Sequence, residues 1–283
     1  KDLIHFSNDD NMRSIPHLMD GLKPSQRKIL YGAYLRGLDK TEVKVAQLAG
    51  FVSDRAAYHH GEMSLNGAIV GMAQNFIGSN NINLLKPNGG FGTRLLGGKD
   101  AASPRYIFTE LSPLCKHILN TDDNVVLNQL YDDGYAIEPE YYAPIIPMVL
   151  VNGAKGIGTG FSTTIPNYNP KDLINNILRL LDDQKLKSMI PYYNNFTGSI
   201  TKVDKNTFNI EGVYKIKGDK MIITELPIGE WTTNYKEFLE KLLDIENSKK
   251  TKSFLGYKDK NTDEKVHFEL SFAKGYLEKA KDI

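Results

Sequence analysis

The chain has 283 residues, of which 41% are hydrophobic and 24% charged, which is ordinary for a globular protein with a substantial core. Lys and Arg number 35 against 34 Asp and Glu, so the chain as a whole is not a polycation. The single cysteine, Cys115, excludes an internal disulfide and a cysteine-based zinc cluster, and is typical of a reducing compartment. No apolar run approaches membrane-span length, so we expect no membrane partner.

Three helices are predicted in the first part of the chain. Residues 20–35 carry apolar side chains at helical spacing, with Pro24 near the helix start. Residues 44–54 predict a short helix that ends near Gly50, and residues 64–76 carry one apolar stripe. Two short helices, a glycine-containing turn and a cationic loop are the layout of a helix-turn-helix with a wing, although any small helical bundle would share the helical part.

The wing is the glycine-rich stretch from Asn88 to Tyr106, which contains the cations Arg94, Lys99 and Arg105. Glycine lets backbone N–H groups approach a phosphate, and the cations supply charge-assisted hydrogen bonds. Tyr106, next to Arg105, is therefore a candidate nucleophile for a phosphodiester. The alternative is a flexible surface loop whose tyrosine only packs.

The remaining elements predict a mixed α+β (α/β) protein. We expect the following elements: a helix over 106–119, β structure over 138–170 with a glycine-rich turn, a helix over 171–183, strands over 196–227 with turns at 204–206 and 218–219, a helix over 232–243, a strand over 266–272 and a final helix. The prolines before residue 171 indicate a boundary, so we expect one domain over residues 1–165 and a second over 166–283.

Seven phrases of the sequence, in order, resemble the breakage-reunion core of DNA topoisomerase II (type IIA). They are DGLKPSQRKILYG, EVKVAQLAG, YHHGEMSL, AQNFIGSNNINLL, GGFGTRLLGGKDAASPRYIFTEL, EPEYYAPIIPMVLVNGAKGIGTGFST and ITELPIGEWT. The eukaryotic-type enzyme is more similar than bacterial gyrase A. The resemblance is strongest over 9–170 and looser over 186–283. It implies a winged-helix domain followed by part of a tower domain.

The resemblance also implies a reaction. The Tyr106 hydroxyl attacks a DNA phosphate, expels the 3′ hydroxyl and forms a 5′-phosphotyrosyl link, which religation reverses. Arg105 would hold the scissile phosphate, and Arg13 and Lys23 would add positive charge. His60 would donate a hydrogen bond to the phosphate or relay a proton. The structural alternative is that His60 only packs against a neighbouring aromatic ring.

Further DNA contacts follow from the same resemblance. Ile157, within a Gly-Ile-Gly turn, matches an isoleucine that wedges between base pairs and bends DNA. We expect additional DNA contacts from basic residues of the first predicted helix and of the wing, namely Arg27, Lys28, Arg94 and Lys99.

We expect no metal site in this chain, because its adjacent aspartates resemble solvated turn residues rather than an Asp-x-Asp pair in a strand. The resemblance implies Mg²⁺ bound by a TOPRIM domain and ATP bound by an ATPase domain, both outside this chain. The partners are double-stranded DNA and a second copy in a homodimer. Since the chain begins at Lys1 rather than at a methionine, we expect a fragment of a longer protein that binds DNA but does not cleave it efficiently alone.

Two rival functions compete with this hypothesis. A winged-helix module that bends DNA without catalysis would keep the wing and the wedge but would tolerate phenylalanine at position 106. A site-specific recombinase would place its tyrosine near the C-terminus among Arg and His clusters, which is not the position of Tyr106. The compartment stays open: nucleus for a cellular eukaryotic protein, host cytoplasm or virion for a viral one.

Overall fold

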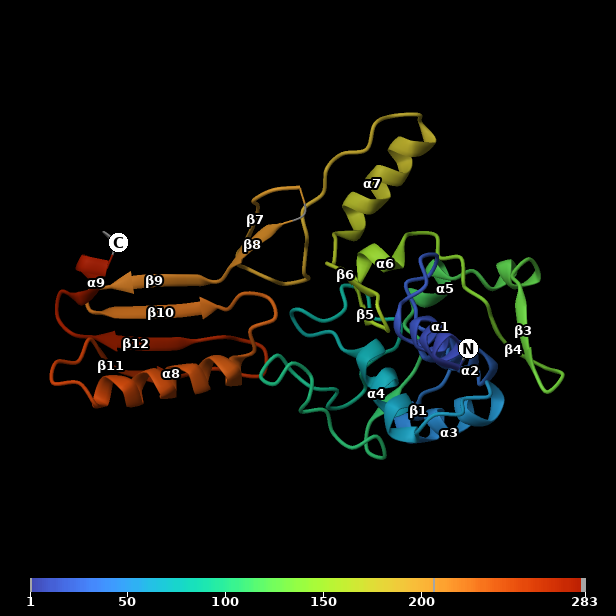
Figure 1. Cartoon of the computed structure of the whole chain (residues 1–283), viewed down its shortest axis with the longest axis horizontal. Helices are drawn as coiled ribbons and strands as arrows, with labels where there is room; N and C mark the ends of the chain where they lie inside the picture. Colours follow the sequence, from blue (N-terminus) through green and yellow to red (C-terminus); the bar gives the residue numbers. More distant parts are fainter. Residues whose placement is uncertain (1, 206, 281–283) are drawn as a thin grey trace. The chain divides into compact units, whose positions relative to one another are not determined.

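A computed structural model describes residues 2–205 and 207–280 (Figure 1). Internal contacts divide this part of the chain into two compact units. The first unit takes up residues 2–75, 79–91 and 101–193, and the second takes up residues 76–78, 92–100, 194–205 and 207–280. Both units combine helices with small antiparallel sheets, which confirms the predicted fold class.

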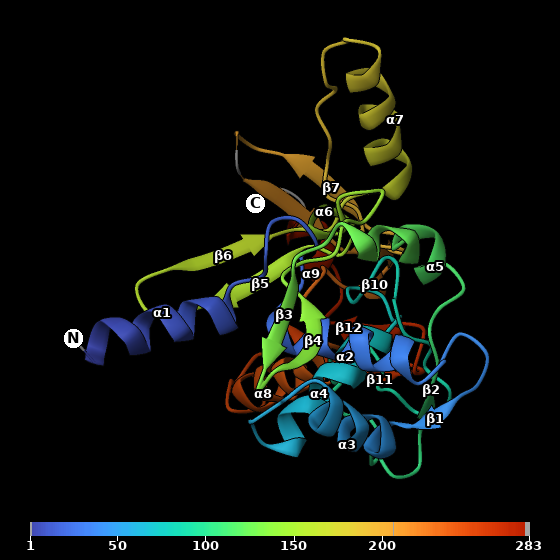
Figure 2. The ribbon, with the colours of Figure 1, turned by 90° about the vertical axis from the view of Figure 1, so that its right-hand side faces the viewer.

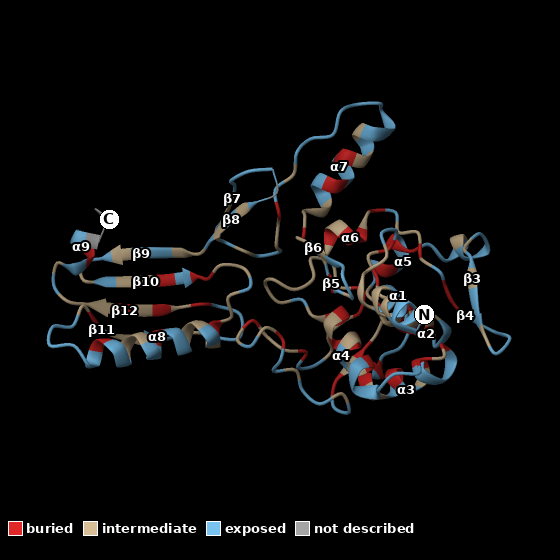
Figure 3. Ribbon diagram, viewed as in Figure 1, coloured by how far each residue is buried: buried red, intermediate tan, exposed pale blue. Residues whose placement is uncertain are grey.

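The first unit begins with four helices: α1 (Asp2–Ser14), α2 (Pro24–Leu35), α3 (Val45–Arg55) and α4 (Glu62–Ala73). Pro24 lies in the first turn of α2, where its missing N–H costs no helical hydrogen bond. Helices α2, α3 and α4 pack together through fully buried side chains such as Ile29, Leu48 and Leu65. Figure 3 shows buried segments, in red, along α3 and α4, interrupted by exposed segments in pale blue. The three predicted helices are confirmed.

Two details of the helical region differ from the prediction. Helix α1 was not predicted; none of its residues is buried, so it has no apolar stripe to signal it. Helix α3 does not end near Gly50 but continues to Arg55, because the buried side chain of Val52 extends its apolar face by another turn. A Cβ atom on Gly32 would lie 2.6 Å from Val52 Cγ2, so the glycine lets α2 approach α3 closely.

The stretch after Tyr106 is extended, and the predicted helix over 106–119 is wrong. Strand β2 (Phe108–Thr109) pairs antiparallel with β1 (Val43–Lys44), and only α5 (Cys115–Ile118) is helical. Ile107, Thr109 and Leu111 are buried while the residues between them are partly exposed. This alternation is the period of a strand, which the apolar content of the segment obscured.

The rest of the first unit consists of short elements: a 3₁₀ helix η1 (Thr121–Val125), the hairpin β3 (Gln129–Asp132) and β4 (Tyr135–Pro139), α6 (Met148–Val151), the hairpin β5 (Ala154–Ile157) and β6 (Ser162–Ile165), and α7 (Pro170–Leu181). The β structure expected over 138–170 is confirmed for the second hairpin, whereas α6 is helical. The Asn169 side chain caps α7 by accepting the Lys171 N–H at 2.9 Å. Leu173 of α7 is buried in the core of the first unit, so this compact unit extends beyond residue 165.

The second unit contains the hairpin β7 (Ser199–Lys202) and β8 (Phe208–Glu211), and a four-stranded sheet with α8 (Thr232–Asn247) and α9 (Tyr276–Ala280). The sheet order is β11 (Phe254–Asp259), β12 (Phe268–Phe272), β10 (Lys220–Glu225), β9 (Val213–Lys217). Helix α8 buries Leu239 in a core with Phe254 and Phe268. The predicted strands and helices are confirmed here, except that β11 was missed and that Asn206, of the turn predicted at 204–206, lies outside the described residues.

The glycines of the wing have structural roles in the second unit. Gly97 has a positive φ of 62°, and a Cβ atom there would collide with the indole ring of Trp231. Trp231 also packs edge-on against Phe76, with ring centroids 5.7 Å apart. Gly92 similarly faces the backbone of Gly98, whose carbonyl oxygen would lie 2.6 Å from a Cβ atom. These glycines therefore allow close packing within the protein.

We expect Gly97→Ala to destabilise the protein more than Gly218→Ala does. Both positions have similar positive φ angles, 62° and 57°, but nothing lies within 4 Å of a Cβ atom on Gly218. Gly218→Ala should lower the free energy of unfolding by about 1 kcal/mol, because alanine is strained at a positive φ. Gly97→Ala should lower it by about 1–3 kcal/mol more, because the added methyl group overpacks against Trp231. Urea denaturation followed by the fluorescence of Trp231, the single tryptophan, measures both. Equal destabilisation would contradict the packing role.

A buried ion pair fixes the turn between α1 and α2. Arg27 Nε donates to Asp20 Oδ2 at 2.8 Å, and Arg27 Nη2 donates to Asp20 Oδ1 at 3.2 Å. The same carboxylate accepts the backbone N–H groups of Leu22 at 2.9 Å and Tyr142 at 3.0 Å. Both side chains are buried, so each charge depends on the other for compensation.

Removal of the Asp20 carboxylate should leave the Arg27 charge buried and uncompensated. We expect Asp20→Ala to lower the free energy of unfolding by about 3–5 kcal/mol. The matched control is Asp54→Ala, which removes the exposed partner of Arg55 and should change that free energy by less than about 0.5 kcal/mol. Urea denaturation of both variants makes the comparison. A loss for Asp20→Ala no greater than that of the control would refute the role of the pair.

Candidate active site

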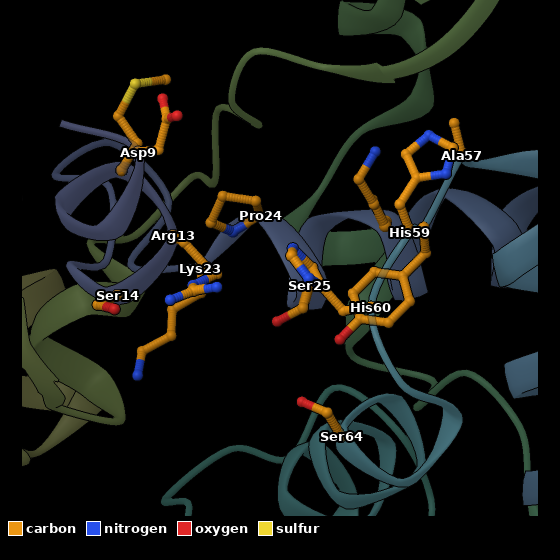
Figure 4. A pocket seen from close by; sticks show the side chains of 13 residues that line it. Asp9, Arg13, Ser14, Lys23, Pro24, Ser25, Ala57, His59, His60 and Ser64 are labelled. Atoms are coloured by element: carbon orange, nitrogen blue, oxygen red, sulfur yellow. The ribbon is translucent and has the colours of Figure 1, made fainter. Parts of the chain in front are cut away.

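A cavity of about 550 Å³ in the first unit brings together three separate segments of the chain (Figure 4). The residues that line it come from α1, from the start of α2, and from the turn before α4 together with the first turn of α4: Asp9, Met12, Arg13, Ser14, Lys23, Pro24, Ser25, Lys28, Ala57, Tyr58, His59, His60 and Ser64. Arg13, Lys23 and His60, which the family resemblance predicts as catalytic residues, all line this one cavity.

The two helices present Arg13 and Lys23 in different ways. Arg13 lies in the last turn of α1, and its side chain is 56% exposed while it pairs with Asp10 at 3.0 Å. Lys23 is the N-cap residue of α2, where its backbone N–H donates to Gln26 Oε1 at 2.9 Å. The Lys23 side chain is partly exposed and forms no ion pair with the described residues. Two cations with accessible side chains therefore meet at one cavity, an arrangement that suits the binding of a phosphate.

Two of the basic residues predicted to contact DNA from α2 have structural partners instead. Arg27 is buried in its ion pair with Asp20, which does not support the predicted DNA contact. Lys28 lines the cavity, but its ammonium group pairs with Glu138 at 2.9 Å and donates to the Ala56 carbonyl at 2.5 Å. Its charge is compensated within the protein, which does not support a DNA contact.

The two histidines of the cavity differ in their contacts. His59 Nε2 lies 3.3 Å from Asp132 Oδ2 in the β3–β4 hairpin. His60 is exposed and packs edge-on against Tyr58, with ring centroids 5.4 Å apart. The described residues give His60 no carboxylate partner, so its ring nitrogens are accessible to a ligand in the cavity. The aromatic packing and the proposed role in proton transfer are therefore compatible.

Tyr106 lies on an exposed but well-anchored loop. Its side chain is 71% exposed, and the Arg105 guanidinium carbon is 6.0 Å from the centre of its ring. The first turn of α3 holds the loop on both sides of the tyrosine: the Val45 N–H donates to the Ile107 carbonyl at 3.0 Å and the Ala46 N–H to the Pro104 carbonyl at 3.1 Å. The helix start thus satisfies two free N–H groups and fixes the backbone of the nucleophile. Tyr106 does not line the cavity.

The two cations of the wing belong to the second unit and have different environments. Arg94 is buried and pairs with Glu225 at 2.6 Å, while the other Glu225 oxygen accepts the Thr197 hydroxyl at 3.0 Å. This burial does not support the predicted DNA contact of Arg94. Lys99 is exposed, and in the described part of the chain no carboxylate pairs with it. The predicted DNA contact of Lys99 stays a prediction.

Ile157 lies at the end of β5, next to the tip of the β5–β6 hairpin, and is 72% exposed. The Gly158 N–H donates to the Phe161 carbonyl at 2.9 Å, which closes the turn. Phe161 is 70% exposed, so two large apolar side chains lie close to this tip. Phe161 was missed, because the sequence does not show which face of the turn an aromatic residue takes. Exposed apolar side chains of this kind are able to enter between base pairs.

Acidic and sulfur-bearing side chains do not gather into a metal site in the described part of the chain. Among residues 2–205 and 207–280, no group of three or more His, Cys, Asp or Glu side chains is arranged to hold a metal ion. None of the helices over the same residues has the length and apolar character needed to cross a membrane.

Known proteins match this chain over almost its whole length. The family described as the A subunit of DNA gyrase/topoisomerase IV matches residues 13–282. DNA topoisomerase 2 of Caenorhabditis elegans is 52% identical over 100% of this chain and 19% of its own length, and that of Bombyx mori is 55% identical over 98% and 18%. The crystal structure of the Plasmodium falciparum topoisomerase II DNA-binding, cleavage and re-ligation domain matches with a TM-score of 0.95 at 48% identity, over 100% of this chain and 38% of that one.

The chain therefore belongs to the family of DNA gyrase/topoisomerase IV A subunits. Its similarity to eukaryotic topoisomerase II at about 50% identity confirms the resemblance inferred from the sequence motifs. The chain spans about a fifth of the length of these curated relatives.

Accessible and buried cations should differ in their effect on DNA binding. We expect Arg13→Ala and Lys23→Ala each to weaken binding of a duplex and to reduce the slope of log K against log salt by about 0.9. Arg94→Ala should leave that slope unchanged and instead lower the free energy of unfolding by about 3–5 kcal/mol, because Glu225 loses its buried partner. Fluorescence anisotropy at several salt concentrations measures the slopes. A reduced slope for Arg94→Ala would contradict the expectation that only the accessible cations bind DNA.

Proposed function

We propose that this chain is the DNA cleavage and religation part of an ATP-dependent type IIA topoisomerase. The observation that carries the proposal is the exposed Arg105–Tyr106 pair on an anchored loop, in a chain about 50% identical to topoisomerase II. The matched Plasmodium falciparum structure is titled a DNA-binding, cleavage and re-ligation domain, which supports the same assignment.

In the proposed reaction, Tyr106 Oη attacks the phosphorus atom of a DNA phosphodiester. A phosphorus–oxygen bond forms to the tyrosine, the bond to the 3′ oxygen breaks, and the 3′ oxygen gains a proton as the tyrosine loses one. The number of phosphoester bonds does not change, so attack by the 3′ hydroxyl reverses the step without an energy source. Arg105 remains charged and would stabilise the additional negative charge of the transition state.

The cavity would bind the DNA backbone beside the reacting phosphate. Arg13 and Lys23 would supply two positive charges, and the His60 imidazole would donate a hydrogen bond to the phosphate or relay a proton. Since Tyr106 does not line this cavity, a DNA strand would have to extend from the cavity to Tyr106 of the same chain. Alternatively, the cavity and the tyrosine would come from different protomers of a homodimer. Exposed Ile157 would enter between base pairs and bend the duplex.

The complete enzyme would require parts outside this chain. Mg²⁺ would be bound by a TOPRIM domain and would stabilise negative charge at the phosphate, and ATP would be bound by an ATPase domain. The partners are double-stranded DNA and a second copy of the protein, because a double-strand break needs two tyrosines. On its own, this chain should bind DNA and cleave it poorly.

Substitution of the nucleophile tests the reaction directly. The segment is joined to its TOPRIM region, mixed with end-labelled duplex and Mg²⁺, and quenched with detergent to trap protein linked to a 5′ end. Tyr106→Phe should abolish the adduct, because phenylalanine has no hydroxyl group. The matched control is Tyr131→Phe, at a tyrosine with a similar exposure of 68%, and it should retain the adduct.

Bound and bent DNA without an adduct under any metal condition would overturn the catalytic proposal. That outcome would favour the DNA-bending module without catalysis.

A further inference from the structure

Helix α1 and the β5–β6 hairpin lie side by side (Figure 2). Two glycines of the hairpin make this close approach possible. A Cβ atom on Gly156 would collide with the Ser14 carbonyl oxygen, and one on Gly158 would collide with Asn11 Oδ1. The glycines on either side of Ile157 therefore fit the hairpin against the helix that carries Arg13.

Asp10 connects the two elements by hydrogen bonds. Its Oδ1 atom accepts from Arg13 Nη2 at 3.0 Å, and its Oδ2 atom accepts from the Thr159 hydroxyl at 2.8 Å. Asn11 Nδ2 donates to the carbonyl of the same threonine at 3.2 Å. Thr159 lies between the exposed side chains of Ile157 and Phe161. One carboxylate thus contacts both a cation of the cavity and the turn that carries the apolar wedge.

The surroundings of Asp10 favour its charged form. The hydrogen bond from Thr159 and then the contact with Arg13 hold the pKa of the Asp10 carboxyl below its usual range. The carboxylate accepts hydrogen bonds on both oxygens, from Arg13 and Ser14 on Oδ1 and from Thr159 on Oδ2, which restricts the rotation of its side chain. A displacement of the hairpin would therefore change the position of Arg13.

We propose that Asp10, through Thr159, is a positioning residue that couples the bending of DNA by the Ile157 hairpin to the contact of Arg13 with the DNA backbone. The inference rests on the proposed function. When DNA displaces the hairpin, the Thr159–Asp10–Arg13 connection would bring the Arg13 guanidinium group into its working position in the cavity. Asp10 and Thr159 do not themselves contact the reacting atoms.

The test uses the longer protein with its TOPRIM region and a duplex of about 30 base pairs labelled at both ends. Energy transfer between the labels reports bending, and the trapped adduct reports cleavage. Thr159→Val removes only the hydroxyl, whereas Thr159→Ser keeps it. The matched control is Thr164→Val, an exposed threonine of β6 in the same hairpin whose side chain forms no hydrogen bond with the described residues. Thermal unfolding confirms that each variant is folded.

We expect Thr159→Val to lower both the bent fraction and the adduct rate about fivefold, the factor expected for the loss of one net hydrogen bond. Thr159→Ser should restore both, and Thr164→Val should match the wild type. In an Arg13→Ala background, Thr159→Val should lower the adduct rate much less than fivefold, because the two residues act through the same connection.

Three results would overturn the coupling: wild-type bending and cleavage in Thr159→Val, no restoration by serine, or a full fivefold effect in the Arg13→Ala background. Failure of the proposed function is distinguishable, because the unsubstituted protein would then form no adduct.

Discussion

The buried ion pair between Asp20 and Arg27 is the constraint on which the geometry of the cavity depends. Two charges removed from water need each other and a full set of hydrogen bonds. The carboxylate meets this need by also accepting N–H groups from Leu22 and Tyr142, and so ties the turn between α1 and α2 to a segment 122 residues away. Lys23 follows this turn directly, so the pair holds the backbone from which Lys23 lines the cavity.

The same physical rule separates the basic residues of the chain into two groups. Arg27, Lys28 and Arg94 each have a buried carboxylate partner and therefore hold the structure together. Arg13 and Lys23 remain accessible, since the Arg13 side chain is 56% exposed beside its partner Asp10 and Lys23 forms no ion pair with the described residues. A cation that is buried with its carboxylate partner is not available to a phosphate, whereas an accessible cation is. Local accessibility, rather than the number of basic residues, therefore selects the groups that we propose bind DNA.

The candidate nucleophile combines an exposed side chain with a fixed backbone. Hydrogen bonds from the start of α3 anchor residues on both sides of Tyr106, and Ile107 is buried beneath the loop. This arrangement reduces the conformational freedom that a tyrosine must lose when it reacts. The β5–β6 hairpin follows the same principle, because α1 supports its tip while Ile157 and Phe161 project from it. Rigid elements thus present both groups that the proposed reaction directs at DNA.

The sequence by itself determined the family, the helices whose apolar residues recur at helical spacing, and the Arg105–Tyr106 pair, because these are local patterns of consecutive residues. Through the family resemblance it also predicted Arg13, Lys23 and His60 as site residues. Only the tertiary structure decided that these three line one cavity and that Arg27 and Arg94 are buried in ion pairs. Arg94 and Glu225 are 131 residues apart, and no local pattern indicates that they meet. The strand at Phe108 and the link between Asp10 and Thr159 likewise depend on packing between distant segments, since burial and hydrogen bonding are properties of the folded chain.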